Sequence, residues 1–416
     1  MTRVKRAQLF LTSLAIVFVL SACAGKEEAG ETSLVMEPET VQATTTKEPP
    51  AQEPEPPAPV EENTNYGKIV QLIGEQTLTG IQWTFSTGGP IHATPVIENG
   101  IVYVGSNDKN MYAVLAETGE MKWKFPADAE VRTTVSLDEQ TLYFADALGH
   151  MYALNKENGE LKWQFTADGD ERTTKDEWDY FDSSPVIAGE LVYYGTDNNY
   201  FYALNRSTGD EVWKYNLEYA THSTPAYDNG VIYIATWFGD FFALDAKTGK
   251  LRWVKNRLGS FQGSPVVAGD KIYVGSRDGA CIYALDIKTG EKVWNHKSGK
   301  MSWYVSRPVV QDGVLYSGSS DDKEVLALDA ETGEVRWKID ADSHVNSNPL
   351  LVDNVLYVNT GFAYKNKHDD YIYAIDPATG ETFWMMTMDS PMYASPAYAD
   401  NRLFVAAENG NLYAIK

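Results

Sequence analysis

Short stretches of alternating apolar and polar residues occupy most of the chain, and turn-forming residues separate them. In the segment 224–255 there are four such stretches, at 224–227, 231–235, 241–244 and 251–255. Alternation with a period of two is typical of β-strands that bury one face. Asn229-Gly230 and Thr248-Gly249 separate the first and last pairs, and both dipeptides favour the positive φ of a tight hairpin turn. The segment therefore predicts a four-stranded antiparallel sheet.

The same pattern returns along the chain with a period of 40 to 50 residues. Each unit carries the sequence Ala-x-Asp/Asn-x-x-Thr-Gly-x-x-x-Trp, which stands in full at 243–253. The other copies lie at 113–123, 153–163, 203–213, 284–294, 327–337 and 374–384. Four-stranded units at this period predict a β-propeller, in which each sheet is a blade that cannot bury its apolar faces without its neighbours.

The two ends of the repeat region predict how the ring closes. The last unit has strands at 394–398, 403–406 and 412–415 and then stops, while a single strand at 80–85 precedes the first unit. That strand carries Trp83 where the other units have the tryptophan of their fourth strand. We expect it to complete an eighth blade and remove the open edge. The fold class is therefore all-β, an eight-bladed propeller of four-stranded antiparallel blades over residues 66–416.

Eight tryptophans occupy equivalent positions in this arrangement, and we expect them to be structural. Each would lie between neighbouring blades, where it buries a large area. They are Trp83, Trp123, Trp163, Trp213, Trp253, Trp294, Trp337 and Trp384.

The repeats resemble the tryptophan-docking repeats of the pyrroloquinoline quinone (PQQ) propeller superfamily over residues 80–416. Two branches of that superfamily differ in function. One comprises PQQ-dependent dehydrogenases, and the other comprises non-catalytic BamB-like lipoproteins of the outer-membrane β-barrel assembly machinery. A lipoprotein signal followed by little besides the repeats resembles the second branch, which implies a protein-binding scaffold without a cofactor.

The residues that the enzyme branch typically uses are sparse here. Its members place a vicinal Cys-Cys disulfide against the quinone, whereas Cys281 is the only cysteine of the repeat region. A single cysteine in a strand is most often a small buried apolar residue. The six histidines lack metal-ligand spacing, and known nucleophile, P-loop and zinc-protease motifs are missing. The acidic segment 318–322 reads as a hairpin turn, with a calcium loop as the alternative.

The N-terminus reads as an export signal followed by a tether. Residues 1–22 combine Arg3, Lys5 and Arg6 with an apolar run that ends at Leu20-Ser21-Ala22-Cys23. This end resembles the lipobox of bacterial lipoproteins, which implies a lipid on Cys23; an ordinary signal peptide with a coincidental cysteine is the alternative. Residues 23–65 are rich in Glu and Pro and predict a disordered tether. Such a tether would span about 35 Å as a coil and about 130 Å when stretched.

Charge and location limit the range of partners. The net charge of −23 disfavours nucleic acid, because the sequence shows no compensating basic patch. A lipidated, exported chain would sit on the periplasmic side of an outer membrane if the cell has two membranes. It would sit on the outer face of the cell membrane if there is one.

The two faces of the predicted ring differ. The turns between first and second strands, and between third and fourth strands, are short and lie together on what we call the turn face. The remaining connections lie on the opposite side, the loop face, and carry the irregular sequence. All three tryptophans outside the repeat map to the loop face, as do several other aromatic residues: Trp178, Tyr180, Trp237, Phe238, Trp303 and Tyr304. Variable loops on a rigid scaffold favour a binding role.

A set of mostly polar residues recurs three positions before the proline that starts each first strand. Because side chains alternate along a strand, this set should ring the mouth of the central channel. Its members are His92, Arg132, Asp182, His222, Gln262, Asn346 and Tyr393, and Val305 breaks the series in the sixth blade. Two interpretations stay open: a ligand site, or a polar lining that a water-filled channel simply requires.

We therefore predict a non-catalytic, membrane-anchored envelope protein that binds a protein partner through its loop face. Binding of cell-wall or other polysaccharide at the same mouth is one alternative, since aromatic rings stack on sugars. PQQ-dependent oxidation is the other.

Overall fold

The computed structural model describes residues 69–72, 79–168, 183–299, 304–361 and 370–416. All of them belong to the unit formed by residues 61–416. Within this part of the chain every regular element is a β-strand, and no helix has the length and apolar character needed to cross a membrane. The predicted all-β class is confirmed.

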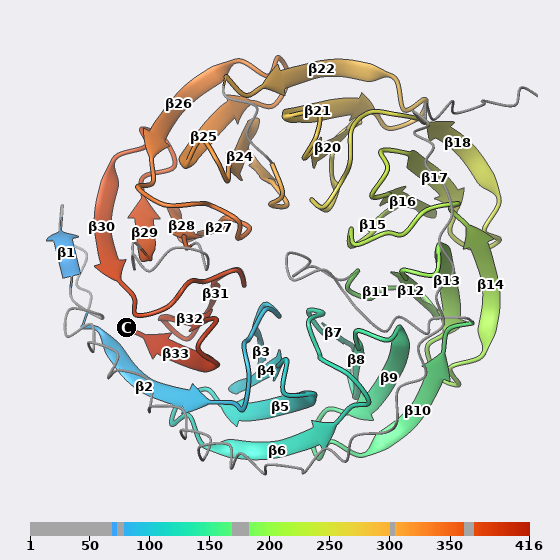
Figure 1. The fold of residues 1–416 in the computed structure, drawn as a ribbon, viewed down its shortest axis with the longest axis horizontal. Helices are drawn as coiled ribbons and strands as arrows, with labels where there is room; N and C mark the ends of the chain where they lie inside the picture. Colours follow the sequence, from blue (N-terminus) through green and yellow to red (C-terminus); the bar gives the residue numbers. More distant parts are fainter. Residues whose placement is uncertain (1–68, 73–78, 169–182, 300–303, 362–369) are drawn as a thin grey trace, which may run out of the picture. The chain divides into compact units, whose positions relative to one another are not determined.

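Eight sheets are arranged as blades around a ring, as Figure 1 shows. The first four blades are β3 (Val96–Glu98), β4 (Ile101–Gly105), β5 (Asn110–Leu115) and β6 (Met121–Pro126); β7 (Ser136–Leu137), β8 (Thr141–Ala145), β9 (His150–Asn155) and β10 (Leu161–Thr166); β11 (Val186–Ala188), β12 (Leu191–Gly195), β13 (Tyr200–Asn205) and β14 (Glu211–Asn216); and β15 (Ala226–Asp228), β16 (Val231–Ala235), β17 (Phe241–Asp245) and β18 (Leu251–Lys255).

The remaining blades continue in chain order until the last one. They are β19 (Val266–Ala268), β20 (Lys271–Gly275), β21 (Cys281–Asp286) and β22 (Lys292–Lys297); β23 (Val309–Gln311), β24 (Val314–Gly318), β25 (Glu324–Asp329) and β26 (Val335–Asp340); β27 (Leu350–Val352), β28 (Val355–Asn359), β29 (Tyr371–Ile375) and β30 (Thr382–Thr387); and β31 (Ala397–Ala399), β32 (Arg402–Ala406) and β33 (Asn411–Ile415) with β2 (Ile81–Ser86).

The eighth blade closes as predicted. β2 pairs antiparallel with β33, so the strand that precedes the first blade supplies the outer strand of the last one. The backbone N–H of Gly80 donates to the carbonyl of Lys416 at 3.0 Å. Both ends of the repeat region are therefore tied into one sheet, which removes an open edge.

The seventh blade contains a strand that the sequence did not predict. β1 (Ile69–Leu72) pairs antiparallel with the outer strand β30, so this sheet has five strands. The outer strand of a blade presents unpaired backbone groups, which a further strand can satisfy. A four-residue segment outside the repeat carries no periodic signal, which explains why the pattern missed it.

The repeated motif is a β-hairpin between the third and fourth strands. In the fourth blade Ala243 pairs with Trp253 and Leu244 pairs with Leu251, so Arg252 is an extra residue in a bulge. Asp245 stabilises the turn, because its Oδ1 accepts hydrogen bonds from the backbone N–H of Thr248 at 3.0 Å and from its hydroxyl at 2.8 Å. The small Ala opposite the indole leaves room for the larger side chain.

The repeat tryptophans join neighbouring blades. Trp213 of the third blade donates its Nε1–H to the carbonyl of Ala246 in the fourth at 3.0 Å. Gly249 lies flat against the same indole, and a Cβ at this position would be 2.7 Å from its Cε3. Gly249 also has a φ of 67°, which favours glycine. The glycine of the motif in one blade therefore packs against the tryptophan of the motif in the preceding blade.

Candidate binding surface at the mouth of the channel

Residues from all eight blades meet at the centre of the ring around a cavity of about 70 Å³. Six predicted mouth residues line it together: His92, Arg132, His222, Gln262, Asn346 and Tyr393. Val305 lines it as well, as the apolar member of the series. The neighbouring positions Ile91, Val131 and Val345 are fully buried between blades, which is the alternation expected of an extended strand. The volume holds about five water molecules.

A chain of side-chain hydrogen bonds runs around this cavity one step below the mouth. The residue concerned lies two positions after the mouth residue of each blade. In seven blades its side-chain oxygen accepts a hydrogen bond from the backbone N–H of the equivalent residue in the preceding blade. The bonds join Thr94 to Thr134 (3.3 Å), Thr134 to Ser184 (2.9 Å), Ser184 to Thr224 (3.0 Å), Thr224 to Ser264 (3.0 Å), Arg307 to Asn348 (2.6 Å), Asn348 to Ser395 (3.0 Å) and Ser395 to Thr94 (3.2 Å). Thr224 and its neighbour Pro225 were predicted to be part of the first strand, but β15 begins at Ala226 because the Thr224 amide bonds to the next blade instead.

Arg307 interrupts this chain between the fifth and sixth blades. It stands where the other blades have Ser, Thr or Asn, so the amide of Ser264 lacks the corresponding acceptor among the described residues. Water reaches the Arg307 side chain, yet the surrounding protein desolvates it and lowers its pKa. Desolvation without a partner charge is unfavourable.

We therefore expect Arg307→Thr to stabilise the protein by about 1 kcal/mol, because a threonine hydroxyl supplies the acceptor that the amide of Ser264 lacks. Urea unfolding followed by circular dichroism measures the change. The matched change Thr224→Val, which removes an existing acceptor, should destabilise by a similar amount. A loss of stability in Arg307→Thr would show that the chain of hydrogen bonds does not act as described.

Two histidines of the mouth are held by carboxylates. Nε2 of His92 lies 2.6 Å from Oε2 of Glu408, and Nε2 of His222 lies 2.7 Å from Oδ1 of Asp197. The side chains of His92 and His222 are only 3% and 6% exposed. Both rings are therefore fixed by loop residues of their own face, and they form a rigid polar floor.

A group of aromatic residues and one arginine lies beside these histidines on the loop face, where the fourth and fifth blades meet. We call this group the aromatic cluster; it consists of Tyr219, His222, Trp237, Phe238 and Arg277. The rings of Tyr219 and Phe238 lie 4.8 Å apart, and those of His222 and Trp237 lie 4.9 Å apart. The Arg277 guanidinium lies 5.2 Å from the centre of the Trp237 ring, which is a cation–π geometry.

This cluster is open to solvent. Phe238 is 64% exposed, the highest value among the large apolar side chains of the described residues, and Tyr219 is 38% exposed. An exposed phenylalanine that stacks on a second aromatic ring is a preformed apolar contact surface. Aromatic residues and arginine are also the types that dominate protein-binding energetics.

The sequence interpretation missed two members of the cluster and misplaced another residue. Tyr219 and Arg277 were not predicted, although both occupy loop-face connections beside His222 and Trp237. Tyr304 was predicted to contact a ligand, but it is 1% exposed and packs between the fifth and sixth blades. Its position corresponds to the buried Ile91 and Val131. Four other predicted contact residues, Trp178, Tyr180, Asp182 and Trp303, and the lipidation residue Cys23, lie outside the described part of the chain.

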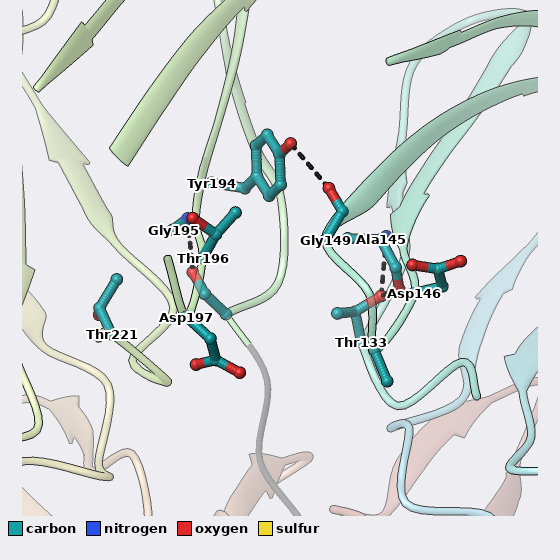
Figure 2. A pocket seen from close by; sticks show the side chains of 11 residues that line it. Thr133, Ala145, Asp146, Gly149, Tyr194, Gly195, Thr196, Asp197 and Thr221 are labelled. Carbon is teal, nitrogen blue, oxygen red and sulfur yellow. Dashed lines mark hydrogen bonds between the residues drawn. The ribbon is translucent and has the colours of Figure 1, made fainter. Parts of the chain in front are cut away.

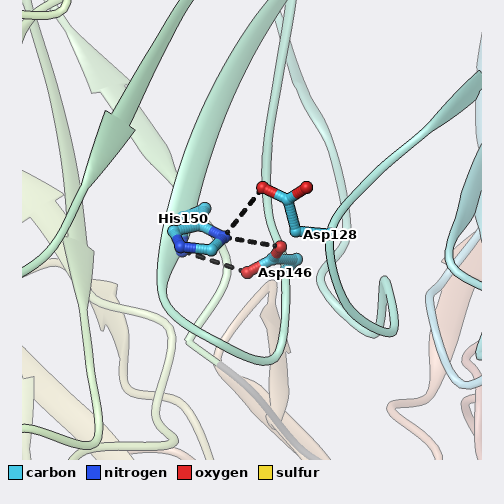
Figure 3. Close-up of side chains that lie close together, drawn as sticks. All are labelled: Asp128, Asp146 and His150. Atoms are coloured by element: carbon cyan, nitrogen blue, oxygen red, sulfur yellow. Dashed lines mark hydrogen bonds and ion pairs between the residues drawn. The ribbon is translucent and has the colours of Figure 1, made fainter. Parts of the chain in front are cut away.

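One group of side chains among the described residues has the composition of a metal site. Ligand atoms of Asp128, Asp146 and His150 all lie within 4.8 Å of one another, as Figure 3 shows. Protein donors already occupy the Asp146 carboxylate: the amides of Leu148 and His150 bond to Oδ1 at 3.0 Å, and the Tyr152 hydroxyl bonds to Oδ2 at 3.0 Å. The group is a hydrogen-bonded turn of the second blade.

A narrow space also lies between the second and third blades, as Figure 2 shows. Its volume is about 20 Å³, room for a single water molecule. Tyr194 spans it and donates to the carbonyl of Gly149 at 3.0 Å, and Asp197 faces it from the third blade. The space is too small for a ligand.

The described residues that line the central cavity do not fit a PQQ cofactor. The central cavity holds only a few water molecules, whereas this cofactor is a tricyclic quinone with several carboxylates. Cys281, the one free cysteine in the described residues, is buried in the third strand of the fifth blade and contacts Gly279 and Asn295 rather than the central cavity. We therefore derive no reaction step that involves PQQ.

Comparison with known protein families identifies the relatives of this ring. The sequence profile of the family described as outer membrane protein assembly factor BamB matches residues 74–224, 202–307, 282–369 and 368–416. These overlapping matches cover most of the chain. The chain belongs to the BamB family. The resemblance stated from the repeat motif is thereby confirmed.

Solved structures share the BamB-like fold at low sequence identity. BamB from Moraxella catarrhalis has a TM-score of 0.65 at 18% identity, over 82% of this chain and 98% of that one. The computationally designed protein Ika8 has a TM-score of 0.66 at 14% identity, over 79% and 96%. The quinohemoprotein alcohol dehydrogenase from Comamonas testosteroni has a TM-score of 0.65 at 15% identity, over 81% and 76%. A comparison with curated proteins found no match. Since one fold serves an assembly factor, a designed protein and an enzyme, the site must decide the function.

Proposed function

We propose that this BamB-family protein is a non-catalytic scaffold of the cell envelope that binds a protein partner through the loop face, in a role related to the assembly of outer-membrane proteins. The observation that carries the proposal is the aromatic cluster at the mouth of the channel. A contact surface of this kind on a highly charged protein marks an interaction site.

The geometry of the cluster suits a protein partner. Phe238 and Tyr219 offer an apolar platform, and the Arg277 guanidinium, which stacks on Trp237, supplies a planar cation on the same face. The adjoining floor is polar and fixed by the His92 and His222 contacts. An apolar centre beside a rigid polar rim is the usual anatomy of a protein interface. An extended peptide or an exposed strand edge of the partner would fit this surface.

The N-terminal sequence supports a location at a membrane. Export directed by residues 1–22, a lipid on Cys23 and a tether over 23–65 would hold the propeller outside the cytoplasm and within reach of membrane proteins. The family description, outer membrane protein assembly factor, agrees with such a location.

Substitution of the cluster tests the proposal. We expect Phe238→Ala and Arg277→Ala each to weaken partner binding by about tenfold, because each truncates a contact of hot-spot type. The measurement is the amount of a membrane β-barrel protein or assembly component that copurifies with the tagged full-length protein from solubilised membranes. Val293→Ala is the matched control, since Val293 is 50% exposed on the outer strand β22, away from the mouth. Equal recovery with all three variants would contradict the proposal.

A further inference from the structure

A cavity of about 450 Å³ opens on the turn face where the fourth and fifth blades meet. This is the side of the ring opposite the aromatic cluster, so the inference goes beyond the proposed function. Tyr233 and Trp253 contribute aromatic surface, and Val231 and Ile287 contribute aliphatic surface. The size falls within the range of roughly 300–1,000 Å³ that is usual for small-molecule sites.

The cavity lies at a joint between blades that lacks a contact made at five of the other joints. Tyr357 of the seventh blade and Phe404 of the eighth do not make this contact within the described residues either. In five blades the tyrosine of the second strand donates its hydroxyl to the same carbonyl that accepts the tryptophan N–H. These bonds run from Tyr103 to Lys156 (3.2 Å), Tyr143 to Arg206 (3.1 Å), Tyr193 to Ala246 (3.0 Å), Tyr273 to Ala330 (3.0 Å) and Tyr316 to Pro377 (3.1 Å).

Tyr233 is the equivalent residue of the fourth blade, and it does not make this bond. Its hydroxyl has no hydrogen-bond partner among the described residues, although the side chain is only 2% exposed and lines the cavity. The neighbouring bond from Trp253 to the carbonyl of Ile287 is also long, at 3.3 Å, against 3.0 Å for Trp213. Burial raises the pKa of Tyr233 to about 12, so the hydroxyl is a neutral donor and acceptor. Because this hydroxyl has no protein partner and borders the cavity, it is available to a bound ligand.

The rim of the cavity offers hydrogen-bonding groups of both kinds with no net charge. Asp228 and Asp270 provide carboxylates, Arg252 and Lys288 provide cationic donors, and Asn229 provides an amide. Arg252 is paired with Asp245 at 2.9 Å and Asp270 with Lys271 at 2.7 Å. The rim charges, counted with these partners, cancel, which disfavours both an anionic and a cationic ligand. Alternating donors and acceptors around an aromatic floor match the hydroxyls and the apolar C–H faces of a sugar ring.

We propose that this cavity binds a neutral sugar residue of a glycan, with a sugar oxygen accepting the hydrogen bond of the Tyr233 hydroxyl and the ring packing against Trp253. The sugar would take the position of the blade-to-blade contact that is missing at this joint. The propeller would then hold a glycan on its turn face independently of any protein on its loop face.

The test uses the full-length protein with ¹³C-labelled isoleucine methyl groups and three neutral disaccharides as probes: cellobiose, maltose and N,N′-diacetylchitobiose. We expect at least one of them to shift the Ile287 methyl resonance in a saturable manner. The methyl of Ile234, which is fully buried in the fourth blade, should not move. If none of the three shifts Ile287 at millimolar concentration, the proposal is wrong.

Two pairs of variants separate binding from folding. Tyr233→Phe should weaken the disaccharide by about fivefold and leave thermal unfolding unchanged, because no protein hydrogen bond is lost. Tyr193→Phe should leave binding unchanged and lower stability, because its hydroxyl bonds to Ala246. Asp270→Ala should weaken binding, whereas Glu190→Ala, the acid at the same turn of the third blade, should not. Equal effects within either pair would overturn the assignment.

Discussion

A chain that begins at Gly88, and therefore lacks β2, is expected to lose most of its stability. β2 supplies the outer strand of the eighth blade, and its Trp83 and Phe85 pack against the core shared with the first blade. Trp83 also donates its indole N–H to the carbonyl of Ala116 at 3.1 Å. Removal of two such aromatic side chains costs about 6–10 kcal/mol, which approaches the entire stability of a typical domain.

Thermal unfolding by circular dichroism measures this loss. The control is a chain that begins at Thr79, because it lacks β1 but keeps β2 and the contact between Gly80 and Lys416. We expect the control to unfold close to the full-length temperature, whereas the chain without β2 should melt far lower and aggregate through the open edge of β33. Equal melting temperatures for the two chains would contradict ring closure by β2.

Replacement of a repeat tryptophan should be far more damaging than replacement of a tryptophan at the mouth. Trp123 is 9% exposed, donates to the carbonyl of Lys156 at 3.1 Å and packs against Gly159 of the next blade. Trp123→Ala should therefore destabilise the protein by about 4 kcal/mol. Trp237→Ala should cost no more than about 1 kcal/mol, because that ring is partly exposed and joins no two blades through an indole hydrogen bond.

Urea unfolding of both variants gives the comparison. Because the repeat tryptophan is shared by two blades, the loss in Trp123→Ala should appear in one cooperative transition rather than as melting of a single blade. Similar losses in the two variants would show that the blade-to-blade tryptophan contact is not what holds the ring.

The fold could be predicted from the sequence because every blade needs the same few contacts. Ala243, Asp245, Gly249 and Trp253 each have a visible reason in the hairpin and the blade joint, and seven copies of that spacing make the pattern unmistakable. The polar residues at the mouth followed from the same register, since His92 and His222 stand at one position of successive blades.

The other features of the structure depend on residues that depart from the repeat, and a periodic sequence pattern cannot reveal them. β1 has no counterpart in other blades, and Arg307 becomes unusual only when the hydrogen bonds on either side of it are known. Tyr233 is identical in type to the five tyrosines that make the bond, so its missing bond is invisible in the sequence. Tyr304 shows the opposite error: its aromatic character suggested a contact residue, although its register placed it with the buried Ile91.

The central claim, that the aromatic cluster binds an envelope protein, is tested most directly by photocrosslinking in cells. A photoreactive amino acid would replace Phe238 on the loop face, and a second would replace Thr248 on the turn face as the control. The account predicts an adduct with a membrane β-barrel protein or an assembly component from position 238 only. Adducts with glycan alone at position 238, or the same protein adduct from both positions, would contradict it.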